Sequence, residues 1–167
     1  CMLECELHPC ERLYLPLAPH ANTLRQLLKN TYMNNHLRVL SESMIEMGLP
    51  EIAVSHPADW GIEVPIDRFK NHRIYVWFEM AAGYLASGGD ERTMGSWHTQ
   101  RHVVQFFGFD NGYFHCLLFP AIMRAFDRDV SLPMAFITNE FYRLDGLKFS
   151  TSRAHAIWLL EVLDSVA

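Results

Sequence analysis

The stretch HVVQFFGFDNGYFHCLLFPA, residues 102–121, decides the fold class. Its first part, 102–110, is a β-rich apolar run that ends in glycine and aspartate, which predicts a buried strand. A helix is expected from about residue 111 to 126. The side chains expected on its buried side are Phe114, Leu117, Leu118, Ala121, Ile122 and Ala125. A strand that leads directly into an apolar helix is typical of an α/β protein with a parallel sheet.

The segments on either side continue this alternation. Strand-like patterns cover 73–79, 133–138 and 140–145, and helical patterns cover 21–30, 34–48, 80–87 and 154–164. Between them, residues 50–72 contain three prolines and no helical period, which indicates extended chain and turns. Ligands of such sheets bind at the carboxyl ends of the strands. Asp110, Asn111 and the loop 146–153 are therefore expected on one rim.

Composition narrows the class of protein. Half of the residues are hydrophobic and 20% are charged, so the chain can bury a core. The net charge of −5 argues against a dominant non-specific nucleic-acid surface. Neither a membrane-spanning apolar run nor a signal peptide is visible, which favours a cytoplasmic protein. The first residue is Cys1 rather than methionine, so we expect a part of a longer protein.

Cysteines crowd the start of the chain. Cys1, Cys5 and Cys10, with His8 between them, are soft ligands at short spacing. In a cytoplasmic protein such a cluster suits a structural Zn²⁺ knuckle better than disulfides. The spacing is irregular, so a flexible terminus stays open as the alternative. Cys116 lies in the apolar helix and is expected to be a small core residue.

The stretch DGLKFSTSRAHAIW, residues 145–158, has little value for a core. A turn at Asp145 and Gly146 leads to a lysine, and an apolar run follows. The polar side chains between them are Lys148, Ser150, Thr151, Ser152 and Arg153. Cations and hydroxyls beside a helix N-terminus are suited to holding phosphate.

Several stretches in order then resemble one family. ADWGIEVP, YVWFEMAAGYLAS, FFGFDNGYFHCLLFPA and DGLKFSTSR look like the second half of the catalytic region of methionyl-tRNA synthetases, over roughly residues 20–160. The resemblance implies that 51–167 form the second half of a Rossmann-type domain and that 1–50 form a connective segment, with a knuckle and a helical pair. The last stretch stands where class I synthetases carry the KMSKS loop.

The resemblance also implies a reaction, which is ATP-dependent activation of an amino acid through an aminoacyl-adenylate, with Mg²⁺. Lys148, Ser150, Thr151 and Ser152 would stabilise the pyrophosphate leaving group, with Arg153 in support, because charge that develops on phosphate needs preorganised donors. Gly108 and Asp110 match the family's strand end beside the substrate, and the resemblance implies that they bind ATP together with Lys148 and Arg153. The amino-acid pocket would comprise Trp77, Met80, Ala81, Tyr84, Asn111 and His115. Without the resemblance, Trp77, Tyr84 and His115 would be interpreted as core residues.

This chain departs from the family pattern at several positions. Thr151 replaces the second lysine of the loop, and Asn111 places an amide where the family pocket is apolar. An unpaired buried amide costs about 1–3 kcal/mol, so Asn111 favours a polar substrate. The other departures are His56 for an arginine, Glu79 for an aspartate, and Asn139-Glu140 for His-Gly.

Three functions remain open at this point. The first is a methionyl-tRNA synthetase, with tRNA as a partner that the net charge does not itself support. The second is a paralogue that activates a free, polar amino acid for a non-tRNA acceptor, as in cupin-linked hydrazine synthetases. The third is a non-catalytic remnant. The first Rossmann half has no counterpart in these residues and is expected from the same or another chain.

Overall fold

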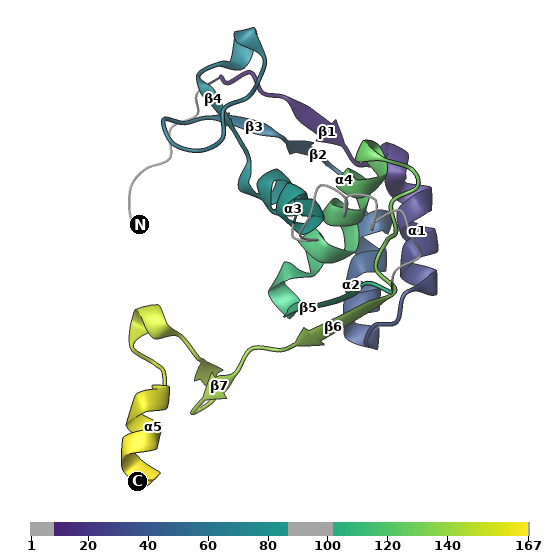
Figure 1. The fold of residues 1–167 in the computed structure, drawn as a ribbon. Helices are drawn as coiled ribbons and strands as arrows, with labels where there is room; N and C mark the ends of the chain where they lie inside the picture. Colours follow the sequence, from purple (N-terminus) through teal and green to yellow (C-terminus); the bar gives the residue numbers. More distant parts are fainter. Residues whose placement is uncertain (1–8, 87–101, 167) are drawn as a thin grey trace.

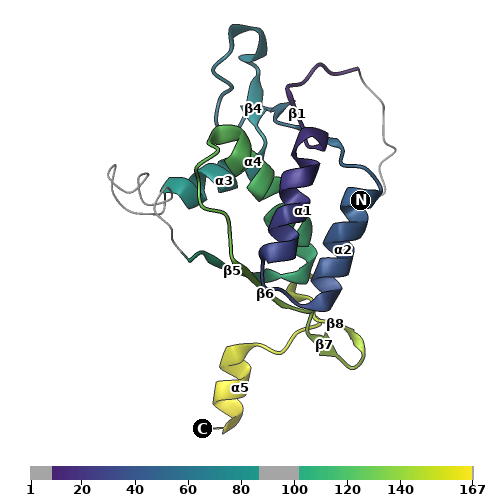
Figure 2. The same ribbon diagram turned by 90° about the vertical axis from the view of Figure 1, so that its right-hand side faces the viewer.

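The computed structural model describes residues 9–86 and 102–166. Its main body combines helices α1 (Ala21–Asn30), α2 (Asn35–Glu46), α3 (Val76–Ala86) and α4 (Phe119–Phe126) with a small parallel sheet. A short hairpin and the helix α5 (Leu159–Val166) project from the end of this sheet, as both views show (Figures 1 and 2). Across the described residues, no helix has the length and apolarity needed to cross a membrane.

The strands of the described residues form four pairs. The antiparallel pairs are β1 (Tyr14–Pro16) with β2 (Glu51–Ala53), β3 (Ser55–Pro57) with β4 (His72–Ile74), and β7 (Arg143–Leu144) with β8 (Leu147–Lys148). The parallel pair is β5 (Val104–Gly108) with β6 (Ala135–Asn139). Single-turn 3₁₀ helices lie at Ala18–His20, Asp67–Phe69, Phe109–Asn111 and Thr151–Arg153.

The parallel pair confirms the predicted α/β character. The register runs from Val104 opposite Ala135 to Gly108 opposite Asn139, so both strands end at the same rim. The crossover between them is helical, with a π-helical turn at Phe114–Leu118 that continues directly into α4. On the other edge of β6, Tyr32 forms a parallel bridge with Ala135. The chain between α1 and α2 therefore borders the sheet.

Two hydrophobic clusters form the core. The first joins α1 and α2 to the sheet and crossover through Leu24, Leu28, Met33, Leu37, Ile45, Phe107, Cys116, Leu117 and Phe136. The second joins α3 to the crossover through Leu17, Ala81, Phe114, Leu118, Phe119, Ala121, Met123 and Val130. Cys116 is a buried core residue as predicted, and burial raises the pKa of its thiol to about 12. The division of the chain at residue 50 stays a prediction.

The prediction of a strand over 73–79 is wrong for most of its length. β4 ends at Ile74, and α3 begins at Val76. A short apolar run fits a buried strand and a buried helix equally well, so periodicity alone could not separate them. The helix is favoured because it places Trp77, Ala81 and Tyr84, spaced at i, i+4 and i+7, on one face against the second cluster.

Other predicted boundaries also move. Ala125 is exposed rather than on the buried side of the crossover helix. The last helix starts at Leu159 instead of 154, because Ala154 adopts a left-handed conformation with φ 51°. The strand predicted over 140–145 is confirmed only at Arg143–Leu144. Gly88, Gly89 and Asp90 predict the start of a polar loop that runs to about residue 99, and this stretch lies outside the described residues.

Candidate active site

The carboxyl rim of the parallel sheet brings together three predicted residues. Gly108 ends β5, and a Cβ atom at this position would lie 2.8 Å from Oδ1 of Asp110. Glycine is therefore needed for the carboxylate to fold back over the strand end. Nδ2 of Asn111 donates a hydrogen bond to the same Oδ1 at 3.3 Å. The side chain of Asn111 is thus exposed at the rim and already has a partner.

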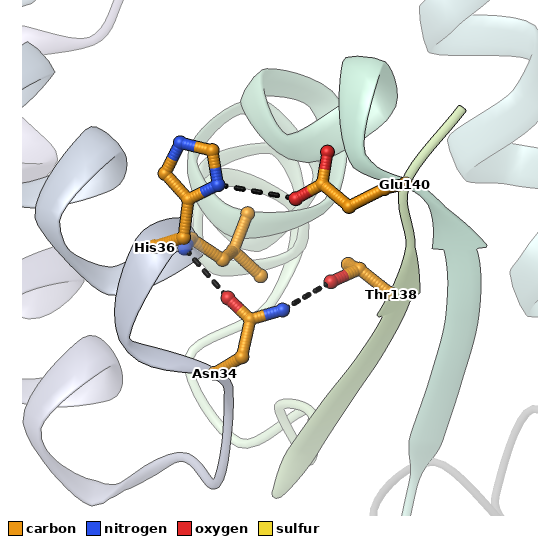
Figure 3. Close-up of polar contacts among 5 residues, drawn as sticks. Asn34, His36, Thr138 and Glu140 are labelled. Atoms are coloured by element: carbon orange, nitrogen blue, oxygen red, sulfur yellow. Dashed lines mark hydrogen bonds and ion pairs between the residues drawn. The ribbon is translucent and has the colours of Figure 1, made fainter. Parts of the chain in front are cut away.

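The start of α2 is tied to the end of β6 at this rim (Figure 3). Asn34 caps α2 by accepting a hydrogen bond from the backbone N–H of Leu37, and its Nδ2 donates to Oγ1 of Thr138 at 2.7 Å. Two residues further along the chain, Nδ1 of His36 lies 3.1 Å from Oε1 of Glu140. Both side chains of this contact are more than half exposed, so its own contribution to stability is small. Together the contacts fix the point where the chain leaves β6 for the β7–β8 hairpin.

An aromatic cluster lies between α3 and the crossover. The ring of Trp77 lies 5.9 Å from that of Phe114, and the ring of Tyr84 lies 6.5 Å from Phe114 and 6.1 Å from His115. Ala81 lies between Trp77 and Tyr84 in the sequence and is fully buried. Met80, at the edge of this face of α3, is 38% exposed. Tyr84 therefore contacts His115, and Trp77 reaches the same cluster through Phe114.

His115 is the polar member of this cluster. It lies in the π-helical turn, is 4% exposed, and stacks on Phe107 with ring centroids 4.0 Å apart. Its Nδ1 lies 3.1 Å from Oε1 of Gln105, a residue of β5 that is 5% exposed. Burial lowers the pKa of His115 to about 4, so the ring is neutral near pH 7. Single-turn π-helices occur frequently at functional sites.

Gln105 is the residue of this cluster that the sequence prediction missed. The available signal was an amide within an otherwise apolar strand, on the same face as Phe107. Buried amides need hydrogen-bond partners, so a glutamine at such a position indicates another buried polar group nearby.

The phosphate-binding loop predicted from the sequence forms a hairpin and a closed turn. Asp145 and Gly146 connect β7 to β8, both with positive φ (50° and 79°), as in a two-residue hairpin turn. Lys148 is exposed, and its Nζ lies 3.6 Å from the ring centre of Phe141. In both views the hairpin projects away from α3 (Figures 1 and 2). The loop and the aromatic cluster are therefore separate in this structure.

The turn after β8 displays its polar groups to solvent. Backbone hydrogen bonds in both directions between Ser150 and His155 close it. The 3₁₀ turn between Ser150 and His155 exposes the side chains of Thr151, Ser152 and Arg153. The hydroxyl oxygens of Ser150 and Ser152 lie 3.3 Å apart. A further contact, which the sequence did not suggest, comes from His155, whose Nε2 donates to the carbonyl of Leu144 at 2.8 Å. The turn is thus tied back onto the hairpin.

A cavity of about 620 Å³ lies on another side of α3, beside β2 and β3. Its wall includes Arg12, Ser55, His56, Trp60, Tyr75 and Glu79. Two of these, His56 and Glu79, are positions where the chain departs from the family pattern. Nδ1 of His56 is enclosed and has no hydrogen-bond partner among residues 9–86 and 102–166. None of the residues predicted for the amino-acid pocket lines this cavity.

The predicted metal knuckle cannot be placed. Cys1, Cys5 and His8 lie outside the described residues, and Cys10 is exposed. Within the part of the chain that the structure describes, no group of three or more His, Cys, Asp and Glu side chains could hold a metal ion. The Zn²⁺ site stays a prediction.

Comparison with known families decides the relationship. The model for class I tRNA synthetases (M) matches residues 1–167, which is the whole chain. The chain belongs to this methionyl-tRNA synthetase family. It is 39% identical over 158 residues to methionine–tRNA ligase from Bacteroides fragilis, which covers 90% of this chain and 23% of that protein. The ligase from Porphyromonas gingivalis is 38% identical over 165 residues and covers 95% of this chain.

Other relatives and solved structures agree with this assignment. Methionine–tRNA ligase from Pyrococcus horikoshii is 33% identical over 172 residues. The crystal structure of Mycobacterium tuberculosis methionyl-tRNA synthetase bound by methionyl-adenylate matches with a TM-score of 0.74 at 20% identity. That match covers 91% of this chain and 30% of that one, and at this identity it shows the fold alone. The chain spans about a quarter of the length of the curated relatives it matches.

Proposed function

We propose that this chain supplies the amino-acid pocket and the triphosphate loop of a methionyl-tRNA synthetase. The observation that carries the proposal is the convergence of Trp77, Tyr84 and His115 in one partly buried cluster. Aromatic walls with a neutral imidazole suit a thioether, which is apolar, polarizable and only a weak acceptor. The curated relatives described above are all named methionine–tRNA ligases, which supports the same substrate.

The argument for a polar substrate loses its basis in this structure. It rested on an unpaired amide of Asn111 within the pocket. Here the side chain is exposed at the rim and donates to Asp110, so it requires no polar partner from a substrate. Methionine is therefore the substrate we propose, and ATP with Mg²⁺ and tRNA are the partners that this function requires.

The rest of the active site is proposed to join at the exposed face of β5. Parallel sheets are normally covered on both faces and extend over several strands. In this chain β6 is bordered by Tyr32, whereas Phe106 of β5 is 75% exposed and Val104 is 43% exposed. We infer that the first Rossmann half packs against this surface and completes the adenylate-forming site.

ATP–pyrophosphate exchange tests the proposed function in the complete protein. Methionine is expected to support exchange, and the other nineteen amino acids are expected to do so at least a hundredfold less well. Trp77→Ala should raise the KM for methionine tenfold or more, since about 1.4 kcal/mol of lost contact corresponds to that factor.

A second tryptophan provides a matched control. Trp60 is 91% exposed and lines the cavity beside β3, so Trp60→Ala should leave the KM for methionine unchanged. Thermal unfolding of both variants checks that any change in KM does not reflect loss of the fold. If Trp60→Ala raised the KM and Trp77→Ala did not, methionine would bind in the cavity beside β3 and the proposed pocket would be wrong.

A further inference from the structure

The inner face of β5 carries one amide among apolar side chains. The neighbours of Gln105 in β5 are exposed, whereas Gln105 and Phe107 lie on the same face of the strand and are both buried. Oε1 of Gln105 lies 3.1 Å from Nδ1 of His115, while its Nε2 is enclosed without a hydrogen-bond partner among the described residues. An enclosed amide that forms one hydrogen bond and leaves its donor unpaired is costly. We therefore expect the single hydrogen bond from His115 to Gln105 to have a role.

The geometry fixes where the proton of His115 lies. A carbonyl oxygen only accepts hydrogen bonds, so Nδ1 must carry the hydrogen that Oε1 of Gln105 receives. The ring is neutral because burial lowers its pKa to about 4, and a neutral imidazole has a single N–H group. Nε2 is then an acceptor with no hydrogen. Since Nδ1 faces β5, Nε2 is the nitrogen that points away from Gln105.

We propose that Gln105 is a positioning residue that holds His115 as the Nδ1–H tautomer and thereby makes the pocket reject side chains that end in a strong acceptor. The proposal rests on the proposed function of this pocket. The thioether of methionine is only a weak hydrogen-bond acceptor. The neutral ring of His115, which stacks on Phe107, would form an apolar wall beside it. Methionine sulfoxide has a side chain of the same length but carries an S=O oxygen on its sulfur. That oxygen would meet the lone pair of Nε2 instead of an N–H donor.

The tautomer can be measured in the complete protein without any assay of activity. In ¹⁵N NMR spectra at pH 8, the two ring nitrogens of a neutral histidine have different shifts according to which one is protonated. The His115 signals are identified as those that disappear in His115→Gln. We expect Nδ1–H in the unaltered chain and in Gln105→Glu, which retains an acceptor oxygen. In Gln105→Leu, which removes the acceptor, we expect the proton to move to Nε2.

Specificity in the complete synthetase provides the functional measurement. The ratio of kcat/KM for methionine over methionine sulfoxide, measured by pyrophosphate exchange, should fall about tenfold in Gln105→Leu, the equivalent of about one buried hydrogen bond. The kcat for methionine should change less than this ratio. Gln105→Glu should keep the ratio within about twofold of the unaltered enzyme, which a merely structural role for Gln105 would not predict.

The two measurements separate this inference from the proposed function. An Nε2–H signal for His115 in the unaltered chain would overturn the inference even if methionine is activated. An unchanged discrimination ratio in Gln105→Leu with a moved proton would also overturn it. If the complete protein activated no methionine, the proposed function would fail, whereas the NMR measurement would still decide the tautomer. The spectrum of the unaltered chain decides this even if Gln105→Leu does not fold.

Discussion

Lys148→Ala is expected to slow methionine-dependent ATP–pyrophosphate exchange about a hundredfold in the complete synthetase, the usual loss for one electrostatic donor at a developing charge. Lys148 is exposed on β8, and its ammonium contacts only an aromatic ring, that of Phe141, among the contacts described here. A cation held over a ring is free to bind phosphate, because no carboxylate of residues 9–86 and 102–166 forms an ion pair with it. The loss should appear in kcat more than in the KM for methionine.

The opposite strand of the hairpin provides a control cation. Arg143 lies directly across from Lys148 in the β7–β8 register and is exposed as well. Arg143→Ala removes the same charge from the same hairpin, and we expect exchange to stay within about threefold. Equal losses in both variants would mean that the hairpin acts through its general charge. Unchanged exchange in Lys148→Ala would exclude this lysine from the reaction.

Thr151 determines how much of the reaction depends on this one lysine. The family pattern has a second lysine at this position, and this chain offers a hydroxyl on the 3₁₀ turn instead. The remaining cation of the turn is Arg153, which is exposed. We therefore attribute the larger share of triphosphate stabilisation to Lys148, with the hydroxyls as neutral donors.

Phe114→Ala should lower the free energy of unfolding of the domain by about 3–5 kcal/mol. Phe114 is 1% exposed, and its ring contacts Trp77, Tyr84, His115 and Phe119. Removing it leaves a cavity beneath the aromatic cluster, so both the packing and the proposed pocket lose their support. Urea unfolding of the complete protein, followed by tryptophan fluorescence, measures the change.

An exposed phenylalanine of the adjacent helix provides the comparison. Phe126 ends α4 and is 57% exposed, so Phe126→Ala should change the unfolding free energy by no more than about 0.5 kcal/mol. A difference below about 1 kcal/mol between the two variants would show that Phe114 is not a central core residue. A large loss only for Phe114→Ala would confirm that the aromatic cluster belongs to the core.

The sequence predicted the sheet best where two signals agreed. At 102–121 a β-rich run leads into a helical period, and the structure has β5 followed by the helical crossover. The turn at Asp145 and Gly146 was predicted because few residues tolerate positive φ, and both adopt it. The apolar run at 73–79 carried a single signal, and tertiary packing of Trp77 and Ala81 decided it in favour of a helix.

The residues of the candidate site also differ in how well the sequence predicts them. Trp77, Tyr84 and His115 were named from the family resemblance, since an aromatic on an apolar helix otherwise indicates only a core. Gln105 was missed because its partner lies ten residues away on another element, and only the fold brings the two together. The rim contacts of His36 with Glu140 join residues more than a hundred positions apart, a separation at which one sequence contains no pairing signal.

A crystal structure of the complete protein with a non-hydrolysable methionyl-adenylate analogue tests the central claim most directly. We expect the methionine side chain within about 4 Å of Trp77, Tyr84 and His115, the distance of apolar contact. A methionine side chain seated instead in the cavity lined by His56, Trp60 and Glu79 would contradict the account.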